Sequence, residues 1–411
     1  MKYKRNKINI LALNCGSSSL KYKIISMPGQ EELVQGEAER VGIKTQDASL
    51  ITHTVLGKKR VIEVELKDHS AALKKILDLI NNDAQDNKEI NFDVFAHRYV
   101  HPGNLFSKPE KVDKVVLRKL EETLSLAAIH NPIVYKLIEF CSREYKRFEQ
   151  FVVFDTTFHR SIPPEFSTYA LPVKISRKYG LKKIGFHGIS HQYVMEEACR
   201  FLNRDIKSQK IISCHLGTGG SSVCAIKGGK SVNTSMGFTP LEGLVMNTRC
   251  GDLDLGLIFY IMFKESFSPV ETEDMLNKKS GILGIFSSSS DLRDVVNSVN
   301  VDPKAKMAFE MYVRRVKAYL GFYSLILKKA DILIFTDSLG AGVPLLRQRI
   351  CEAMEFLGIS LDKERNRSYR NGISELSSAE SGTRILVVPT NEEIMIARET
   401  YKELIKNDTR H

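Results

Sequence analysis

The sequence has no tryptophan, and it has no hydrophobic run long enough to cross a membrane. The longest unbroken apolar stretch near the middle of the chain is Leu257–Phe263, whereas a membrane-spanning helix needs roughly 20 residues. The basic residues at the start are followed by the apolar stretch Ile10–Leu13, which is too short for the core of a signal peptide. We therefore expect no membrane partner and no secretion signal.

Cysteine is also scarce, with seven residues scattered along the chain and no CxxC pair. An odd, dispersed set of cysteines in a chain of this length is typical of free thiols in a reducing compartment. The pattern predicts a cytoplasmic protein.

Clusters of positive charge are missing as well, although the formal net charge is +11. The densest basic groups are residues 2–7, Lys58–Arg60 and Lys182–Lys183, and none is interleaved with the aromatic residues on which single-stranded nucleic acids stack. No zinc-finger or helix-turn-helix pattern is present. We expect no nucleic-acid partner, and we interpret most of the excess charge as solvated surface.

A strand–loop–strand unit occurs twice, half a chain length apart. The apolar run Ile8–Leu13 and the alternating segment Leu20–Ile24 flank a loop of small polar residues. The strands Lys210–His215 and Val223–Ile226 flank a second loop of the same kind. The repetition predicts two related halves.

The segments between these units alternate between helical and strand patterns. Helical spacing predicts helices, and continuous apolar runs predict buried strands. The predicted helices are Lys111–Leu126, Pro132–Arg147, Lys304–Ala330 and a last helix that begins near Glu392; the predicted strands are Asp331–Thr336 and Arg384–Val388. This mixture predicts an α/β fold.

Three loops rich in glycine and serine follow predicted strands, at residues 14–19, 215–222 and 336–342. Such loops present several backbone N–H groups to one anion, so three of them predict a phosphate-rich ligand. None fits the P-loop or the complete GxGxxG pattern, which argues against Walker and Rossmann nucleotide sites.

Short segments rich in histidine, arginine and aspartate lie beside these loops. The planar fork of arginine suits phosphate and carboxylate, and oxygen-bearing side chains suit Mg²⁺. Together they predict phosphoryl transfer, in which positioning and charge neutralisation do nearly all the work. The segments are 96–103, 129–132, 153–163, 185–191, 247–254 and 289–294.

Ten motifs, which run in order from about Ile8 to Thr400, resemble the acetate kinase family, which includes propionate kinase. The most specific of them is the long run between Ser235 and Asp252. The motifs are NCGSSSLK, AHRYVH, FDTTFH, GFHGISH, HLGTGGSS, SMGFTPLEGLVM-x-TR-x-GD, KKSGILG, SSDLRD, CEAMEFLGI and VVPTNEE.

The resemblance implies the duplicated two-domain fold of acetate and sugar kinases, actin and heat-shock ATPases, with a central cleft. It places residues 1–155 and 394–411 in an N-terminal domain with the first phosphate loop and the acetate-binding arginine. Residues 156–393 form a C-terminal domain that binds the phosphoryl donor and holds the dimer interface. The implied reaction is ATP + acetate ⇌ ADP + acetyl phosphate, with Mg²⁺ (Mn²⁺ as the alternative ion), in a homodimer.

Site residues are carried over by motif position. Arg98 matches the arginine that holds the acetate carboxylate, Arg249 and His187 match the pair that stabilises the transferring phosphoryl group, and Asp155 matches the acid near the metal. The metal residues are Asn14 and Glu392, and the apolar acetate pocket is Val100, Ile129, Phe186 and Pro240. The nucleotide or phosphate contacts are Lys21, His215, Leu216, Gly217, Thr218, Gly219, Asp291, Leu292, Arg293, Ser338, Leu339, Gly340, Ala341 and Gly342.

The sequence departs from the family pattern mainly at the loops expected to hold the nucleotide. Thr218 replaces an asparagine, Asp337 and Ser338 replace two glycines, and Ala341-Gly342 replaces Glu-Asn. Side chains there should crowd a nucleoside, and Asp337 adds negative charge near its phosphates. Pyrophosphate and phosphate in place of ATP and ADP therefore remain an alternative. Propionate also stays open as acyl substrate, as does, more remotely, a basic binding protein without catalysis.

Overall fold

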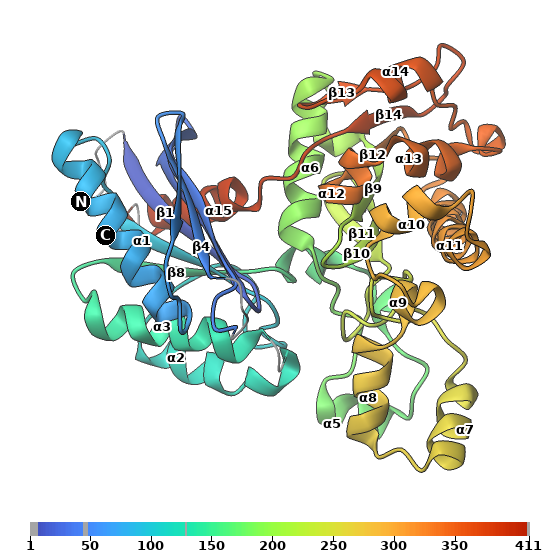
Figure 1. Cartoon of the computed structure of the whole chain (residues 1–411), viewed down its shortest axis with the longest axis horizontal. Helices are drawn as coiled ribbons and strands as arrows, with labels where there is room; N and C mark the ends of the chain where they lie inside the picture. Colours follow the sequence, from blue (N-terminus) through green and yellow to red (C-terminus); the bar gives the residue numbers. More distant parts are fainter. Residues whose placement is uncertain (1–6, 44–47, 128–129, 409–411) are drawn as a thin grey trace. The chain divides into compact units, whose positions relative to one another are not determined.

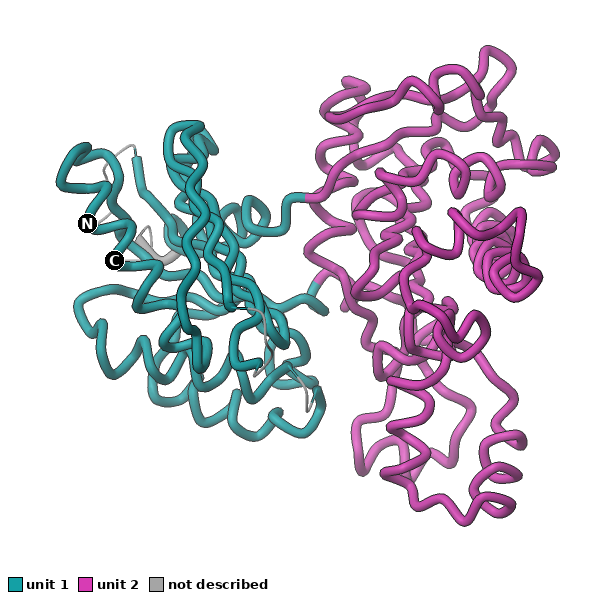
Figure 2. Tube along the Cα trace, in the orientation of Figure 1, with its two compact units in different colours: residues 1–157, 391–411 teal, residues 158–390 magenta. Residues whose placement is uncertain are grey.

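The computed structural model describes residues 7–43, 48–127 and 130–408, and the chain divides into two compact units. Unit 1 comprises Met1–Thr157 and Asn391–His411, and unit 2 comprises Phe158–Thr390 (Figure 2). The division falls a few residues from the boundaries predicted at 155 and 393. The roles assigned to the two domains stay predictions.

Unit 1 is built on an eight-stranded sheet in the order β5-β4-β3-β2-β1-β6-β8-β7 (Figure 1). The strands are β1 (Ile8–Cys15), β2 (Ser19–Met27), β3 (Glu31–Glu39), β4 (Leu50–Val55), β5 (Lys58–Glu63), β6 (Val94–Tyr99), β7 (Glu110–Lys111) and β8 (Glu149–Phe154). The helices are α1 (His69–Asp86), α2 (Lys114–Glu121), α3 (Asn131–Glu144) and α15 (Glu392–Asp408).

The alternation of side chains along β1 separates two packed faces. Leu11, Leu13 and Cys15 join the hydrophobic core that contains the buried residues of α1 and α3. Asn14 points to the opposite face, where its side chain bonds to the first residues of α15. The last helix, α15, therefore contacts the first strand at Asn14, which is a residue predicted to bind the metal.

Unit 2 is built on a six-stranded sheet in the order β11-β10-β9-β12-β14-β13. The strands are β9 (Lys210–Leu216), β10 (Ser221–Lys227), β11 (Lys230–Thr234), β12 (Ile332–Thr336), β13 (Ser374–Glu375) and β14 (Arg384–Val387). The helices are α4 (Pro164–Ser167), α5 (Val173–Tyr179), α6 (Gly188–Phe201), α7 (Leu255–Glu265), α8 (Pro269–Lys278), α9 (Gly281–Phe286), α10 (Leu292–Ser298), α11 (Pro303–Leu327), α12 (Asp337–Gly342), α13 (Pro344–Cys351) and α14 (Lys363–Ser368).

Helices α6 and α11 cover opposite faces of this second sheet (Figure 1). Ile212 and Cys214 of β9 pack in the core formed with α11, whereas their neighbour Ile211 packs with α6. The continuous apolar runs of β9 and β12 thus reflect strands buried on both faces.

The two sheets share one strand pattern. In each, three antiparallel strands (β3-β2-β1 and β11-β10-β9) continue into two strands parallel to the last of them (β6-β8 and β12-β14). The tight turns between β1 and β2 and between β9 and β10 are the repeated glycine/serine loops. The predicted α/β fold with a duplicated architecture is confirmed.

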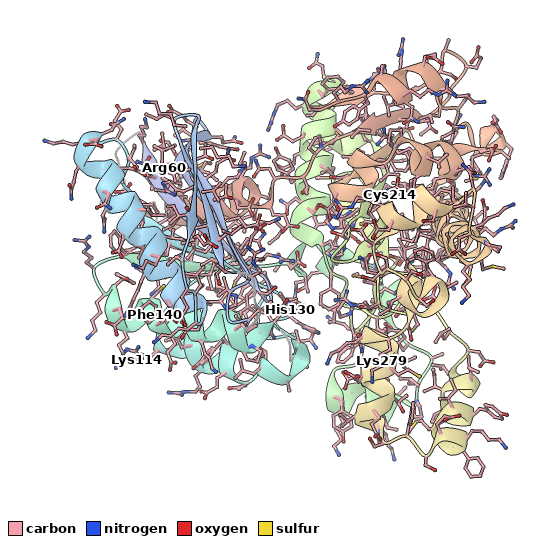
Figure 3. The ribbon with its side chains drawn as sticks, viewed as in Figure 1. Arg60, Lys114, His130, Phe140, Cys214 and Lys279 are labelled. Atoms are coloured by element: carbon pink, nitrogen blue, oxygen red, sulfur yellow. The ribbon has the colours of Figure 1, made fainter. Side chains whose placement is uncertain are left out.

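The seven cysteines are free thiols, and all except Cys250 are buried. Burial raises the pKa of Cys15 to about 12 and that of Cys214, labelled in Figure 3, well above its ordinary value. These thiols stay protonated, which fits packing rather than nucleophilic chemistry. Within the part of the chain that the structure describes, no helix is both long and apolar enough to span a bilayer.

The segment 336–342, predicted as a loop, is instead helix α12. Leu339 is buried in the core of unit 2, and the buried guanidinium of Arg347 donates hydrogen bonds to the carbonyls of Gly340 (2.9 Å) and Ala341 (2.6 Å). Arg347 also donates to Asn366 Oδ1 at 2.8 Å. Arg347, only six and seven residues downstream, thus satisfies the carbonyls at the end of a short helix that the glycine-rich pattern does not signal.

The charge of Arg347 is therefore balanced by carbonyl dipoles, and burial lowers its pKa to about 10. We predict that Arg347→Met lowers the free energy of unfolding by about 3 kcal/mol, because several buried acceptors lose their donor. Urea unfolding measures this loss.

Arg349→Met is the matched control, because Arg349 is on the same helix but is half-exposed and pairs with Glu310. It should cost less than about 1 kcal/mol. Equal losses in the two variants would contradict the structural role given to Arg347.

Candidate functional site

In unit 1, the predicted acetate-binding arginine lies beside the predicted catalytic acid. Arg98 is near the end of β6, and Asp155 directly follows β8, the parallel neighbour of β6. Arg98 Nη2 donates to Asp155 Oδ2 at 3.0 Å, and Nη1 donates to Asn14 Oδ1 at 3.1 Å. Because β1, β6 and β8 run parallel, their carboxyl ends bring these three residues to one edge of the sheet.

Asn14 connects this pair to the start of α15. Its Nδ2 donates to Glu392 Oε2 at 2.8 Å and to Glu393 Oε1 at 3.0 Å. The predicted metal residues, Asn14 and Glu392, are therefore adjacent. The sequence reasoning missed Glu393, although its position next to Glu392 in the VVPTNEE motif was a usable signal.

The acidic surroundings keep Arg98 charged. Burial alone would lower the pKa of its guanidinium, but the carboxylates of Asp155 and Glu392 hold the pKa above its ordinary value. Lys21, on β2 opposite Asn14, adds an exposed positive charge beside the cluster.

The oxygen-rich side chains of this cluster fit a magnesium ion that keeps much of its water. Mg²⁺ is typically held by one or two carboxylates together with substrate phosphates rather than by an all-protein cage. The described residues contain no group of three or more His, Cys, Asp or Glu placed to hold a metal.

In unit 2, His187 and Arg249 converge over a glycine in the turn between β9 and β10. A Cβ atom built on Gly220 would lie 3.3 Å from Arg249 Nη1 and 3.5 Å from His187 Nε2. His187 immediately precedes α6 in a left-handed conformation, with φ of 57°. A larger residue than Gly220 would occupy the space where the two nitrogens meet. Gly220 lies within the predicted loop 215–222, but the phosphate contacts predicted there ended at Gly219 and did not include it.

Arg249 lacks a carboxylate partner among the described residues. The hydrogen bond that its guanidinium makes is a weak one from Nη1 to Met246 Sδ, at 3.7 Å. Burial lowers its pKa, in contrast to the acid-paired Arg98. A partly buried guanidinium that no acid neutralises is an anion receptor.

The predicted phosphate loop is partly filled by side chains from α12. Ser338 Oγ accepts a hydrogen bond from the Thr218 N–H at 3.1 Å, and Asp337 Oδ2 lies 3.2 Å from His215 Nε2. A Cβ atom on Gly217 would collide with the Asp337 carboxylate, which therefore packs directly on this glycine. The side chains of Asp337 and Ser338 therefore contact the loop that is predicted to bind the phosphates.

The remaining predicted nucleotide residues divide between local caps and core. Asp291 caps α10 and pairs with Arg293, whose Nη2 lies 2.5 Å from Asp291 Oδ2. The side chains of Leu216, Leu292 and Leu339 are fully buried in the core of unit 2. Gly219 and Gly342 are exposed, Gly340 is buried, and Ala341 is partly buried.

The residues predicted for the acetate pocket belong to different units, and each is described within its own unit. Val100 is buried directly after β6 in unit 1, whereas Phe186 is buried and Pro240 partly buried in unit 2. Ile129 lies outside the described residues. The pocket as a whole stays a prediction.

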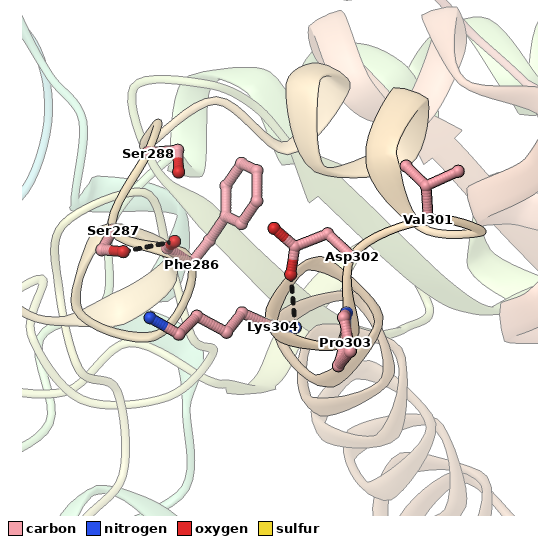
Figure 4. Close-up of a pocket in the computed structure, with 7 residues that line it drawn as sticks. All are labelled: Phe286, Ser287, Ser288, Val301, Asp302, Pro303 and Lys304. Carbon is pink, nitrogen blue, oxygen red and sulfur yellow. Dashed lines mark hydrogen bonds between the residues drawn. The ribbon is translucent and has the colours of Figure 1, made fainter.

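A separate hollow in unit 2 is lined by Phe286–Ser288 and Val301–Lys304 (Figure 4). In it, Asp302 Oδ1 accepts from the Lys304 N–H at 2.7 Å, as the cap of α11. None of the predicted site residues lines this hollow, so we do not assign it to the reaction.

Comparisons with known proteins identify the family of this chain. The model of the acetokinase family matches residues 9–398. Acetate kinase of Thermotoga maritima is 43% identical over 97% of this chain and 99% of its own. Among solved structures, Porphyromonas gingivalis acetate kinase superposes with a TM-score of 0.87 at 37% identity, covering 97% of this chain and 100% of its own.

A propionate kinase from Francisella tularensis superposes equally well. Its TM-score is 0.87 at 35% identity, over 95% of this chain and 98% of its own. With the family model matched over almost the whole sequence and relatives at this level of identity, the chain belongs to the acetokinase family.

Proposed function

We propose that this protein is an acetate kinase, which transfers a phosphoryl group reversibly between ATP and acetate to give acetyl phosphate and ADP. The observation that carries the proposal is the meeting of Arg249 and His187 over Gly220, with no carboxylate among the described residues neutralising Arg249. Such a site suits an anion whose charge increases or spreads during reaction. Membership of the acetokinase family supports the same activity.

In unit 1, Arg98 binds the carboxylate of acetate, and the bonds from its guanidinium to Asn14 and Asp155 fix its orientation. Acetate is ionised at neutral pH, so its oxygen attacks the γ-phosphorus without a general base. Asp155 therefore acts by orienting Arg98 and by its charge. As that oxygen–phosphorus bond forms, the bond to the leaving ADP oxygen breaks.

In unit 2, Arg249 and His187 bind the oxygens of the transferring phosphoryl group. Both donors already lie together over Gly220 before reaction, so their stabilisation of the transition state needs little reorganisation. Asn14 and Glu392 would hold Mg²⁺, with Mn²⁺ as the alternative ion. The ion supplies further neutralisation of phosphate charge.

A second candidate uses pyrophosphate and phosphate in place of ATP and ADP. The specific observation in its favour is that Asp337 packs on Gly217 and that Ser338 Oγ accepts a hydrogen bond from the Thr218 N–H. A smaller donor would not need room for a nucleoside. Propionate is an alternative acyl substrate, because one methylene changes affinity by only about 1–3 kcal/mol in an apolar pocket.

The decisive experiment is to incubate the protein with acetyl phosphate, Mg²⁺ and either ADP or phosphate, and to identify the product. ATP formed from ADP supports the first candidate. Pyrophosphate formed from phosphate, without ATP, supports the second. If neither product forms, the catalytic assignment fails. Once the phosphoryl donor is identified, the rates with acetate and with propionate are compared in the direction that forms the acyl phosphate.

We also propose that the working protein is a cytoplasmic homodimer. Helix α7 has the sequence LGLIFYIMFKE and no buried residue. Leu255, Phe259 and Phe263 are 76%, 72% and 82% exposed. An apolar helix this exposed is typical of a surface that a partner covers, and a second copy of the chain is the occupant we propose. The free thiols support a reducing compartment.

Replacing the guanidinium over Gly220 should stop the chemistry. We predict that Arg249→Ala lowers kcat about 10²–10³-fold, because a preorganised donor to the transition state is lost. Steady-state assays with acetyl phosphate measure the effect. Arg384→Ala, which removes a half-exposed arginine paired with Glu375, is the control and should keep kcat within about twofold. An unchanged kcat for Arg249→Ala would rule out its role.

Removing the carboxylate from the phosphate loop should improve nucleotide binding. We predict that Asp337→Gly lowers KM for ADP about tenfold, because a negative charge beside the loop repels phosphate. Glycine also suits the positive φ of 64° at this position. Asp337→Asn removes the charge but keeps the bulk, so the pair separates the two effects. If KM for ADP does not change in either variant, Asp337 does not shape the donor site.

A charge on α7 should separate the subunits. We predict that Phe263→Glu converts the dimer into a monomer, because a carboxylate buried in an apolar interface lacks a partner. Light scattering coupled to size-exclusion chromatography measures the mass. Phe356→Glu is the control, since Phe356 is 81% exposed outside α7. A wild-type protein that is monomeric would overturn the proposal.

A further inference from the structure

A buried row of alternating serine and histidine side chains ends at His187. Ser213 Oγ on β9 lies 2.9 Å from His191 Nδ1 on α6. His191 Nε2 lies 2.9 Å from Ser222 Oγ on β10, which in turn lies 2.9 Å from His187 Nδ1. Each contact has hydrogen-bond length, so the orientation of one hydroxyl or ring constrains the next.

His191 is neutral in this row. Its side chain is fully buried, and burial lowers its pKa well below the ordinary value. The nearby rings of His159 and His215 act in the same direction. A neutral imidazole carries one N–H, so one ring nitrogen of His191 donates and the other accepts.

Ser213 decides which nitrogen accepts. In the part of the chain that the structure describes, His191 Nδ1 is the one hydrogen-bond partner of the buried Ser213 hydroxyl. A buried hydroxyl hydrogen needs an acceptor, so Ser213 donates to Nδ1. The hydrogen of His191 is then on Nε2 and is donated to Ser222 Oγ.

The direction of the hydrogen bond is also fixed at the other end of the row. Ser222 accepts from His191, so its own hydrogen goes to its second neighbour, His187 Nδ1. A neutral His187 that accepts at Nδ1 carries its hydrogen on Nε2. That nitrogen is the one beside Arg249 Nη1 over Gly220.

We infer that Ser213, His191 and Ser222 are positioning residues that set the tautomer of His187, so that its Nε2–H is donated to the phosphoryl group. No proton is transferred along the row; each group donates one hydrogen bond in the same direction. This inference rests on the proposed phosphoryl transfer for its purpose, but the tautomer itself is a property of the protein alone.

A neighbouring serine and histidine provide a matched control. His159 Nε2 lies 2.9 Å from the Phe186 carbonyl, which can only accept, and its Nδ1 lies 2.9 Å from Ser231 Oγ. The Phe186 carbonyl thus sets the tautomer of His159 without help from the row. Ser231 is as buried as Ser222, so Ser231→Ala removes the same atom from a similar environment.

The experiment compares Ser222→Ala with Ser231→Ala in the full-length protein. Nitrogen-15 NMR of labelled histidine reports the tautomer of His187, assigned with a His187→Gln variant. The other ionisable groups facing the row are Arg249, His159, His215 and Asp337, so spectra are recorded across a range of pH. Kinetics with acetyl phosphate give kcat and KM separately.

We expect wild-type His187 in the Nε2–H form, and a mixture of tautomers in Ser222→Ala. The kcat of that variant should fall about 10–100-fold with KM nearly unchanged, because the donor is misdirected mainly in the transition state. Ser231→Ala should change neither the tautomer of His187 nor kcat appreciably. A purely structural role for Ser222 would lower the yield of folded protein without changing the tautomer.

Two results would overturn the inference: a hydrogen on Nδ1 of His187 in the wild type, or an unchanged tautomer and kcat in Ser222→Ala. If Ser222→Ala does not fold, Ser213→Ala tests the row from its other end and should also give mixed tautomers. An inactive wild-type protein that still shows the Nε2–H form would reject the proposed function while retaining the row.

Discussion

Parallel pairing around one central strand is the constraint on which the rest of each unit depends. In unit 1, β1 pairs with β6 and β6 with β8, so the residues that end these strands meet at one edge. In unit 2, β9 pairs with β12, which sets α12 against the turn between β9 and β10. The central strands β1, β6, β8, β9 and β12 are buried along almost their whole length, which leaves their ends for polar chemistry.

The two arginines predicted to bind the substrates have opposite electrostatic surroundings. Arg98 is surrounded by the carboxylates of Asp155, Glu392 and Glu393, which hold it charged and oriented. Arg249 has no such carboxylate among the described residues, and burial works against its charge. A compensated arginine suits a small monoanion such as acetate, whereas an uncompensated one suits a group that brings several negative charges. The balance of charge around each arginine therefore says more about the expected ligand than the net charge of +11 does.

Much of the fold could be predicted from local pattern. The strand–loop–strand repeats, the helix Pro303–Leu327 and the strands β12 and β14 follow from apolar periodicity and glycine-rich turns, which act over a few residues. Two predictions were wrong in detail. The predicted loop 336–342 is helix α12 from Asp337 onward, where the buried Arg347 binds the last carbonyls. The helix predicted at 111–126 is shortened to α2, whose N-terminus Asp113 caps.

For the site, the sequence by itself determined where side chains of suitable chemistry lie in the chain, and its motifs predicted roles for Arg98, Asp155, His187 and Arg249. Only the tertiary structure decided what surrounds them. Glu393 bonds to Asn14, which is almost a whole chain length away, Asp337 of α12 packs on Gly217, and Ser213 and Ser222 face α6. These contacts depend on strand register and helix docking, which bring together residues far apart in sequence, so no local pattern specifies them.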